Sequence, residues 1–154
     1  MRAHPHSAVL ETPFHDRMAA WCRTNDWGRW AGYISVNAYT EVGLEYFAIR
    51  NASTVFDLSP LVKYRVRGAQ AEAYLDRLVT RDVRKLSPGR VAYCVWCDDR
   101  GHVLDDGTLF RFGPSDFRLL SQERHLPWLL DAAFGYDVEI VDETEAVAAL
   151  ELIR

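Results

Sequence analysis

The sequence has no long run of hydrophobic residues, and this argues against a helical membrane span. A transmembrane helix needs about 20 consecutive apolar residues, and no segment of the 154 residues approaches that length. The first residues, MRAHPHSAVLETPFHDR, also lack the apolar segment and small-residue cleavage site of a secretory signal peptide. We therefore expect a cytoplasmic protein without a membrane partner.

Positive charge is also scarce. The 18 Lys and Arg residues are outnumbered by 22 Asp and Glu residues, and the net charge is -4. The one basic cluster, Arg81, Arg84 and Lys85, has Asp82 in its middle. We interpret this cluster as a solvated helix end or loop. Nucleic-acid binding is not expected, because proteins of that class present a basic face.

Cysteine is represented by three residues, an odd number that argues against a disulfide framework. Cys94 and Cys97 form a Cys-x-x-Cys within RVAYCVWC, a run typical of a strand. Side chains three positions apart on a strand point to opposite faces, so these thiols are not expected to share a metal. A zinc site would also need a second ligand pair, which the sequence does not supply.

The hydrophobic pattern from residue 62 onward predicts an α+β fold, with an antiparallel sheet and helices packed on it. The strands are expected to be short and to alternate apolar with polar residues, and the helices to carry one apolar face. The expected elements are a strand at 61–68, a helix at 69–79, hairpin strands at 90–97 and 102–112, a strand at 117–121, a helix at 125–135, and strands at 137–142 and 146–153.

The N-terminal third predicts less regular structure. We expect a short helix at 17–24, an aromatic loop in NDWGRWAGY at 25–33, and an amphipathic helix within 40–53. The chain is thus interpreted as a single region with an aromatic-rich segment at 1–54 and an α+β sheet unit at 55–154. The apolar run directly before Arg154 indicates a piece of a longer chain.

Two neighbouring aspartates, Asp105 and Asp106, interrupt the second hairpin strand, where Asp is disfavoured. Because neighbouring side chains alternate, one of the two carboxylates must face inward, which is costly unless something binds it. The residues alone support a functional carboxylate and a structural one at a bulge about equally.

The stretch around this pair, DDRGHVLDDGTLFRF, resembles the Gly-Gly-x-x-Asp-Asp hairpin of the glycine cleavage T-protein family, the tetrahydrofolate-dependent aminomethyltransferases. Further segments resemble the family in the same order. They are TPFHD at 12–16, WAGY at 30–33, AIRNASTVFDLS at 48–59 and the run at 66–93. The resemblance covers nearly the whole chain. It implies a fold like the T-protein folate-binding domain, truncated before the family's further substrate-facing region and C-terminal barrel-like domain.

The resemblance also implies tetrahydrofolate as the cofactor and a site for it. Asp105, as the first Asp of the pair, would hold the pterin and be the catalytic carboxylate. A carboxylate suits this role because it only accepts hydrogen bonds, and the pterin offers N–H donors. Tyr33 would contact the cofactor and is the candidate acid for the leaving group. The remaining expected pocket residues are Tyr93, Leu61, Leu120, Ser121 and Gln122.

The register of the hairpin bears on this site. A simple hairpin centred on Asp99 and Arg100 would pair Tyr93 with Asp106. Tyr93 and Asp105 can therefore share a face only if the turn contains a one-residue bulge, and we expect Gly101 to supply it. Two smaller expectations concern neighbours of the site: His125 is expected at the surface, and Arg50 is expected to pair with a carboxylate such as Asp57.

Three departures from the T-protein pattern bear on the one-carbon donor. Pro60 replaces a family His, the segment SQERHLPW is shortened, and Gly107 follows the aspartate pair. These features resemble the tetrahydrofolate-dependent vanillate and syringate O-demethylases, which implies a small-molecule methyl donor. An aminomethyltransferase proper, a folate-binding module without transfer activity and an α+β domain without a folate role remain alternatives. The face left by the missing region is expected to support a homo-oligomer.

Overall fold

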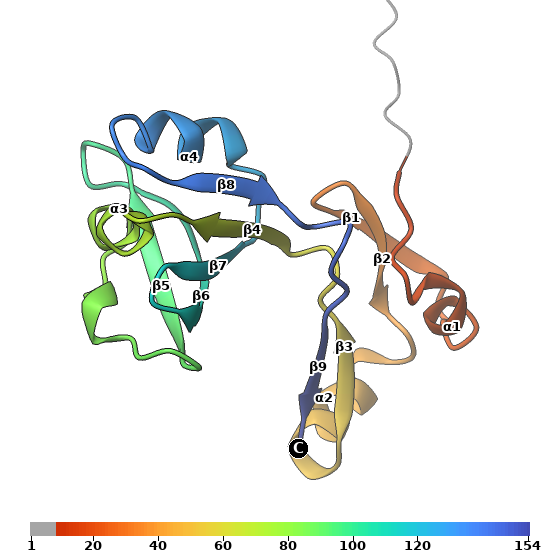
Figure 1. Ribbon diagram of the computed structural model, residues 1–154. Coiled ribbons are helices and arrows are strands. Elements are labelled where there is room, and N and C mark those ends of the chain that lie inside the picture. The colour runs from red at the N-terminus through yellow and green to blue at the C-terminus, as the bar shows by residue number, and fades with distance from the viewer. Residues whose placement is uncertain (1–8) are drawn as a thin grey trace, which may run out of the picture. The chain divides into compact units, whose positions relative to one another are not determined.

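The computed structural model describes residues 9–154 and divides the chain into two compact units (Figure 1). The first unit contains the described residues up to Pro60 together with 148–154, and the second contains residues 61–147. The sequence-based division placed the boundary between residues 54 and 55, with residues 1–8 of its first segment lying outside the described residues. The structural units differ from this division because residues 54–57 pair with residues 150–153, and both segments belong to the first unit.

The second unit is a five-stranded antiparallel sheet with two α-helices, so the α+β prediction is confirmed. The strands lie in the order β5-β6-β7-β4-β8. A single 3-10 turn, Val83–Lys85, precedes β5. The elements are β4 (Val62–Arg67), α3 (Ala71–Leu78), β5 (Val91–Cys97), β6 (Val103–Gly113), β7 (Asp116–Ser121), α4 (Leu126–Ala132) and β8 (Glu139–Asp142).

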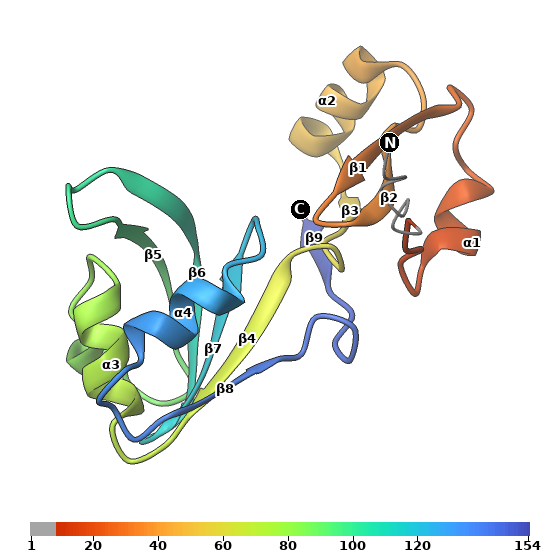
Figure 2. The same ribbon diagram turned by 90° about the horizontal axis from the view of Figure 1, so that it is seen from above.

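The two faces of this sheet differ because each strand alternates. Helices α3 and α4 lie next to each other against one face, the inner face (Figures 1 and 2), and the Tyr74 hydroxyl of α3 donates to the Leu129 carbonyl of α4 at 2.8 Å. Val62, Tyr64 and Val66 of β4 are fully buried on the inner face. The opposite face, the outer face, includes a row across four strands in which Tyr93, Thr108, Leu120 and Lys63 are successive partners.

The turn of the β5–β6 hairpin contains the bulge that the sequence predicts. Asp98 donates its N–H to the His102 carbonyl at 2.9 Å, and Gly101 adopts a left-handed φ of 81°. Glycine suits this position because it has no Cβ to clash in that conformation. The Asp98 carboxylate accepts the His102 N–H at 2.9 Å and holds the turn closed.

A second irregularity in the same hairpin cancels the effect of the first. Cys97 pairs with Val103, but Trp96 pairs with Asp105, so Leu104 is an extra residue on β6. One extra residue exchanges the two faces of a strand, and two extra residues restore them. The prediction that Tyr93 and Asp105 share a face is therefore wrong.

Gly107 allows β6 and β7 to approach closely, and this predicts a large effect of a small substitution. A Cβ at residue 107 would overlap the backbone carbonyl oxygen of Leu120. We expect Gly107→Ala to lower the free energy of unfolding by about 1 to 3 kcal/mol, because backbone atoms of β7 would have to move. Urea unfolding measures this loss. Gly113→Ala on the same strand is the matched control, since its nearest atom is the Asp116 Cβ at 3.7 Å. Equal losses in both variants would contradict the steric explanation.

The first unit begins with a short helix and a hairpin. Helix α1 spans His15–Ala19, earlier in the chain than the predicted helix at 17–24. The predicted loop at 25–33 is instead β1 (Asp26–Trp30) and the start of β2 (Tyr33–Ala38). Ala31 and Gly32 form the two-residue turn, with positive φ values of 48° and 92°. Such a turn matches the twist of a hairpin, and this explains why the prediction of a loop was wrong.

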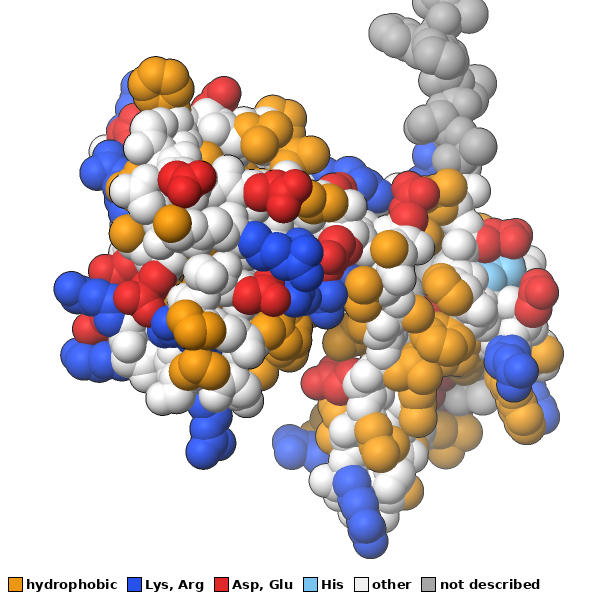
Figure 3. Space-filling model, in the orientation of Figure 1, with side chains coloured by type: hydrophobic (Ala, Val, Ile, Leu, Met, Phe, Trp, Pro, Cys, Tyr) orange, Lys and Arg blue, Asp and Glu red, His pale blue; other side chains and the backbone are white. Residues whose placement is uncertain are grey.

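The rest of the first unit exposes an unusual amount of apolar surface. Helix α2 (Val42–Asn51) confirms the predicted helix but buries no residue. Strands β3 (Thr54–Asp57) and β9 (Leu150–Ile153) form a two-stranded antiparallel sheet. Hydrophobic side chains gather over these elements (Figure 3). The strongly exposed residues are Val42, Leu44, Tyr46, Phe47, Val55, Leu150 and Leu152, which we call the apolar surface.

Candidate functional site

The two aspartates of β6 point to opposite faces of the sheet. Asp105 lies on the inner face opposite Trp96 and is 8% exposed. Asp106 lies on the outer face opposite Val95 and is partly exposed. One carboxylate of the pair therefore faces inward, as strand alternation predicts, and the other is accessible from the outer face.

The Asp105 carboxylate is held by three hydrogen bonds. Its Oδ1 accepts the N–H of Asp106 at 2.7 Å. Its Oδ2 accepts the N–H of Glu123 at 3.1 Å and lies 2.9 Å from His125 Nε2. These partners satisfy most of the acceptor capacity of a buried carboxylate and compensate for its removal from water.

His125 was expected at the surface, and this prediction is wrong. Its side chain is 21% exposed, lies against Asp105 and meets the Trp96 ring edge to face at 6.0 Å. The backbone N–H of His125 donates to the Tyr64 hydroxyl at 2.7 Å. The short segment after β7 turns back over the start of β6, and this contact between residues 20 positions apart has no local sequence signal.

Among the described residues, the Asp106 side chain has one hydrogen-bond partner, Tyr93. The Tyr93 hydroxyl donates to Asp106 Oδ2 at 2.7 Å. This hydrogen bond, with a smaller contribution from burial, raises the pKa of Tyr93 above its usual value, so the phenol keeps its proton at neutral pH. Tyr93 is 59% exposed, and it places an aromatic ring beside a carboxylate on the outer face.

The other predicted site residues separate into distinct environments. Leu120 lies on the outer face in the same row as Tyr93, and Leu61 directly precedes β4, where its carbonyl accepts Lys63 Nζ at 2.7 Å. Ser121 is fully buried on the inner face, and its hydroxyl donates to the Glu123 carbonyl at 2.8 Å. The structure thus groups Tyr93 and Leu120 with Asp106, and Ser121 with Asp105.

The last two predicted residues lie outside the strands of this sheet. Gln122 is exposed directly after β7. Tyr33 belongs to the first unit, at the start of β2, and is 4% exposed. The expected pairing of Arg50 with Asp57 is wrong: the Arg50 guanidinium lies over the Tyr46 ring at 5.6 Å. Asp57 instead accepts hydrogen bonds from the Thr12 hydroxyl and the Ser59 N–H, at 2.6 and 2.9 Å.

The cysteines do not form a reactive pair. Cys94 is buried on the inner face, and burial raises the pKa of its thiol to about 11. Cys97 is partly exposed, and all three cysteines carry free thiols. Within residues 9–154, no three His, Cys, Asp or Glu side chains are arranged to hold a metal ion. In the same part of the chain, no helix is long and apolar enough to cross a membrane.

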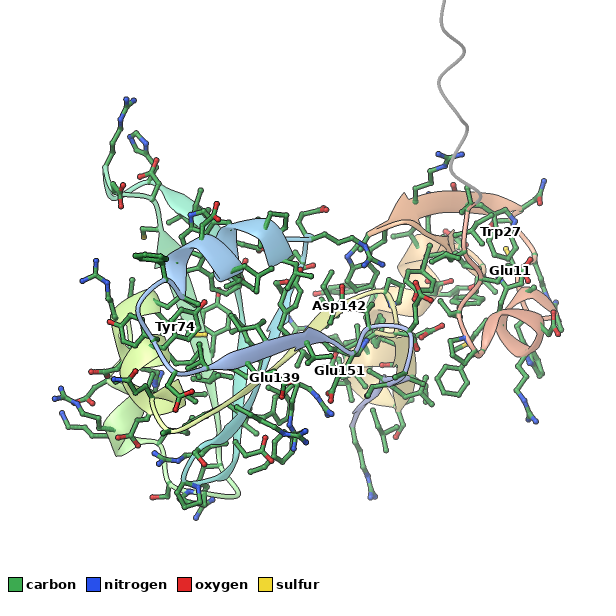
Figure 4. The ribbon with its side chains drawn as sticks, turned by 45° about the horizontal axis from the view of Figure 1, so that its top comes forward. Glu11, Trp27, Tyr74, Glu139, Asp142 and Glu151 are labelled. Atoms are coloured by element: carbon green, nitrogen blue, oxygen red, sulfur yellow. The ribbon has the colours of Figure 1, made fainter. Side chains whose placement is uncertain are left out.

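Each unit also contains a hollow. In the first unit, the hollow has a volume of about 500 Å³ and lies between the β1–β2 hairpin, α2 and β3. In the second unit, the hollow has a volume of about 730 Å³ and lies between α3, α4 and the β5–β6 turn, where Tyr74 is labelled in Figure 4. The aspartate pair lines neither hollow.

Comparison with known proteins gives concordant matches over nearly the whole chain. A family model described as the GCVT N-terminal domain matches residues 11–153. An aminomethyltransferase of Geobacillus thermodenitrificans is 33% identical over 91% of this chain and 38% of its own length. A trimethylamine-oxide aldolase of Ruegeria pomeroyi is 36% identical over 70% of this chain and 14% of its own length.

A solved structure supports the fold. The crystal structure of the glycine cleavage system aminomethyltransferase T from Bartonella henselae matches 95% of this chain with a TM-score of 0.82 and 22% identity. The match covers 41% of that chain. This chain therefore spans about two fifths or less of the length of the proteins it resembles.

Proposed function

This chain belongs to the family of the GCVT N-terminal domain, and we propose that it is the folate-binding part of an enzyme that transfers a methyl or aminomethyl unit to tetrahydrofolate. The observation that carries this proposal is the partly exposed carboxylate of Asp106, which accepts a hydrogen bond from Tyr93 on the outer face. Leu120 lies in the same row as Tyr93, with Thr108 between them. A carboxylate between aromatic and aliphatic side chains suits a flat ligand that offers N–H donors.

The residues present fit tetrahydrofolate, which supplies the nitrogen that accepts the one-carbon unit. Asp106 Oδ1 has no partner among the described residues, so it can accept an N–H of the pterin. Tyr93 holds Oδ2 and offers its ring as a wall. The resemblance assigns the pterin to Asp105 instead. That assignment stays a prediction, and three partners already occupy most of the acceptor capacity of the Asp105 carboxylate.

Titration calorimetry tests whether the chain recognises the pterin. We expect saturable binding of tetrahydrofolate and little binding of p-aminobenzoylglutamate, which carries the folate tail without the pterin. The reason is that the proposed contact, Asp106 with an N–H donor, involves the pterin alone. Equal binding of both compounds would contradict the pterin contact. The same titration can be made with a longer protein, as long as the relatives, that contains this chain. If neither protein binds tetrahydrofolate, the folate function is contradicted.

The finer proposal concerns the donor, which we take to be an aryl methyl ether. Pro60 and the shortened segment after β7 support this branch over an aminomethyltransferase proper. Gly107 supports it less, because the close approach of β6 to Leu120 already requires glycine there. Transfer assays in a full-length protein with a methoxybenzoate and with an aminomethyl donor separate the two. A protein that binds tetrahydrofolate and transfers neither group would be a folate-binding module.

The apolar surface of the first unit supports a proposal about assembly. A two-stranded sheet and a helix without a buried residue are marginally stable unless something covers them. We propose that two copies of this chain associate through this surface. Light scattering is expected to show a dimer for the wild type and a monomer for the Leu44→Glu, Phe47→Glu variant, because both side chains are more than 60% exposed. A wild type that stays monomeric at high concentration would contradict this proposal.

A further inference from the structure

The peptide group that joins the two aspartates links the inner face to the outer face. Asp105 Oδ1 accepts the N–H of Asp106, so the inward carboxylate holds the backbone from which Asp106 projects outward. The direction of the Asp106 side chain is set by the orientation of this peptide, because successive side chains of a strand project from opposite sides. Whatever fixes the Asp105 carboxylate therefore also restrains Asp106.

His125 is the side chain that fixes Asp105. Its Nε2 lies 2.9 Å from Asp105 Oδ2, and the pair is largely buried, with side-chain exposures of 21% and 7%. A hydrogen bond to a carboxylate is stronger than one between neutral groups, and burial shields it from water. The Glu123 N–H, from the same short segment, donates to the same oxygen at 3.1 Å.

His125 is itself held by residues of two other strands. Its N–H donates to the hydroxyl of Tyr64, a fully buried residue of β4. Its ring packs edge to face at an interplanar angle of 89° on Trp96, a fully buried residue of β5. His125 therefore connects the Asp105 carboxylate of β6 to β5 through its ring and to β4 through its backbone N–H. Residues that orient a functional group are commonly held in this way.

We infer that His125 is a positioning residue, which holds Asp105 and, through the Asp106 N–H, presents the Asp106 carboxylate on the outer face. This inference rests on the proposed function for its ligand, but the positioning itself can be measured without a ligand. It assigns different roles to the two aspartates: Asp105 serves as a link inside the sheet, and Asp106 contacts the pterin.

The test compares three variants in amide hydrogen exchange and in tetrahydrofolate titration. His125→Leu keeps the bulk of the side chain and removes its donor, whereas His125→Gln keeps an N–H donor. His102→Leu is the matched control, because His102 also pairs with an aspartate of this hairpin, at 3.2 Å, but its side chain is 73% exposed. Thermal unfolding of each variant shows whether it is folded.

We expect His125→Leu to speed exchange at the Asp106 and Glu123 amides and to weaken tetrahydrofolate binding, each by about tenfold, the loss expected for one hydrogen bond to a charged group. His125→Gln should recover most of both effects, and His102→Leu should change neither. Unchanged exchange at Asp106 in His125→Leu, or equal losses in the Gln and Leu variants, would overturn the inference.

The same data separate this inference from the proposed function. If the wild type fails to bind tetrahydrofolate, the proposed function is overturned, and with it the ligand contact of Asp106. The exchange rates then still decide whether His125 restrains the Asp106 peptide. If exchange responds to His125→Leu while tetrahydrofolate affinity does not, the restraint exists but does not serve the ligand, and the inference is overturned.

Discussion

Replacement of Arg111 by methionine is expected to lower the free energy of unfolding by about 3 kcal/mol, because three backbone carbonyls lose the donor that satisfies them. Arg111 of β6 is 8% exposed. Its guanidinium lies 2.5 Å from a Glu72 carboxylate oxygen and 5.0 Å from the Phe117 ring centre. It also donates to the carbonyls of Leu86, Gly113 and Pro114 at 2.9, 3.1 and 3.0 Å.

The size of this effect follows from the hydrogen-bond acceptors that have no donor in the variant. Methionine can fill much of the space of the arginine side chain, but it offers no N–H donor. Three carbonyls and one carboxylate then lose a partner, and an unpaired buried acceptor costs about 1 to 3 kcal/mol. Glu72 can turn toward water because it lies closer to the surface, so the carbonyls account for most of the expected loss.

Urea unfolding followed by tryptophan fluorescence measures the prediction. Arg118→Met is the matched control. Arg118 donates twice to the Glu143 carboxylate but to no carbonyl of the described residues, and its side chain is 20% exposed. We expect the control to lose less than half as much. If the two variants lose equal stability, the buried carbonyls are not what makes Arg111 important.

The sheet of the second unit could be predicted because its signals are local. Val62, Tyr64 and Val66 alternate with charged residues, and this pattern alone predicts a half-buried strand. The helices and turns between the strands follow from similar short patterns. By contrast, β9 was predicted as a strand but its partner was not, because β3 lies about 95 positions earlier in the chain and pairing over such a distance has no local signature.

The candidate site could be predicted only in part, for a reason that the hairpin makes clear. The aspartate pair and the bulge at Gly101 are visible in the sequence. The second extra residue, Leu104, is not, since nothing distinguishes it from an ordinary strand residue. One residue of register exchanges every side chain between the two faces, so this single omission assigned Tyr93 to the wrong carboxylate. His125 was missed because its contact depends on the path of a nonlocal segment.

The Asp106→Asn variant is expected to weaken tetrahydrofolate binding by about tenfold to a hundredfold, the loss of one charge-assisted hydrogen bond. Asparagine has the shape of aspartate but carries no charge, and one of its two polar atoms is a donor. A pterin N–H would therefore face either a weaker acceptor or another donor. Because Asp106 is partly exposed and its side chain is hydrogen-bonded, within residues 9–154, to Tyr93 alone, we expect the stability of this variant to change little.

The Asp105→Asn variant distinguishes the two assignments of the ligand contact. In this variant the amide NH₂ can face the Glu123 N–H, and two donors repel each other. We therefore expect a clear loss of stability and a loss of tetrahydrofolate affinity smaller than that of Asp106→Asn. If Asp105 held the pterin, as the resemblance implies, the ranking of the affinities would be reversed, and Asp106→Asn would bind nearly as the wild type does. Tyr93→Phe serves as the control. It keeps the aromatic wall and frees Asp106 Oδ2, so tetrahydrofolate should bind with similar or higher affinity. A large loss in Tyr93→Phe would instead show that the phenol itself contacts the ligand.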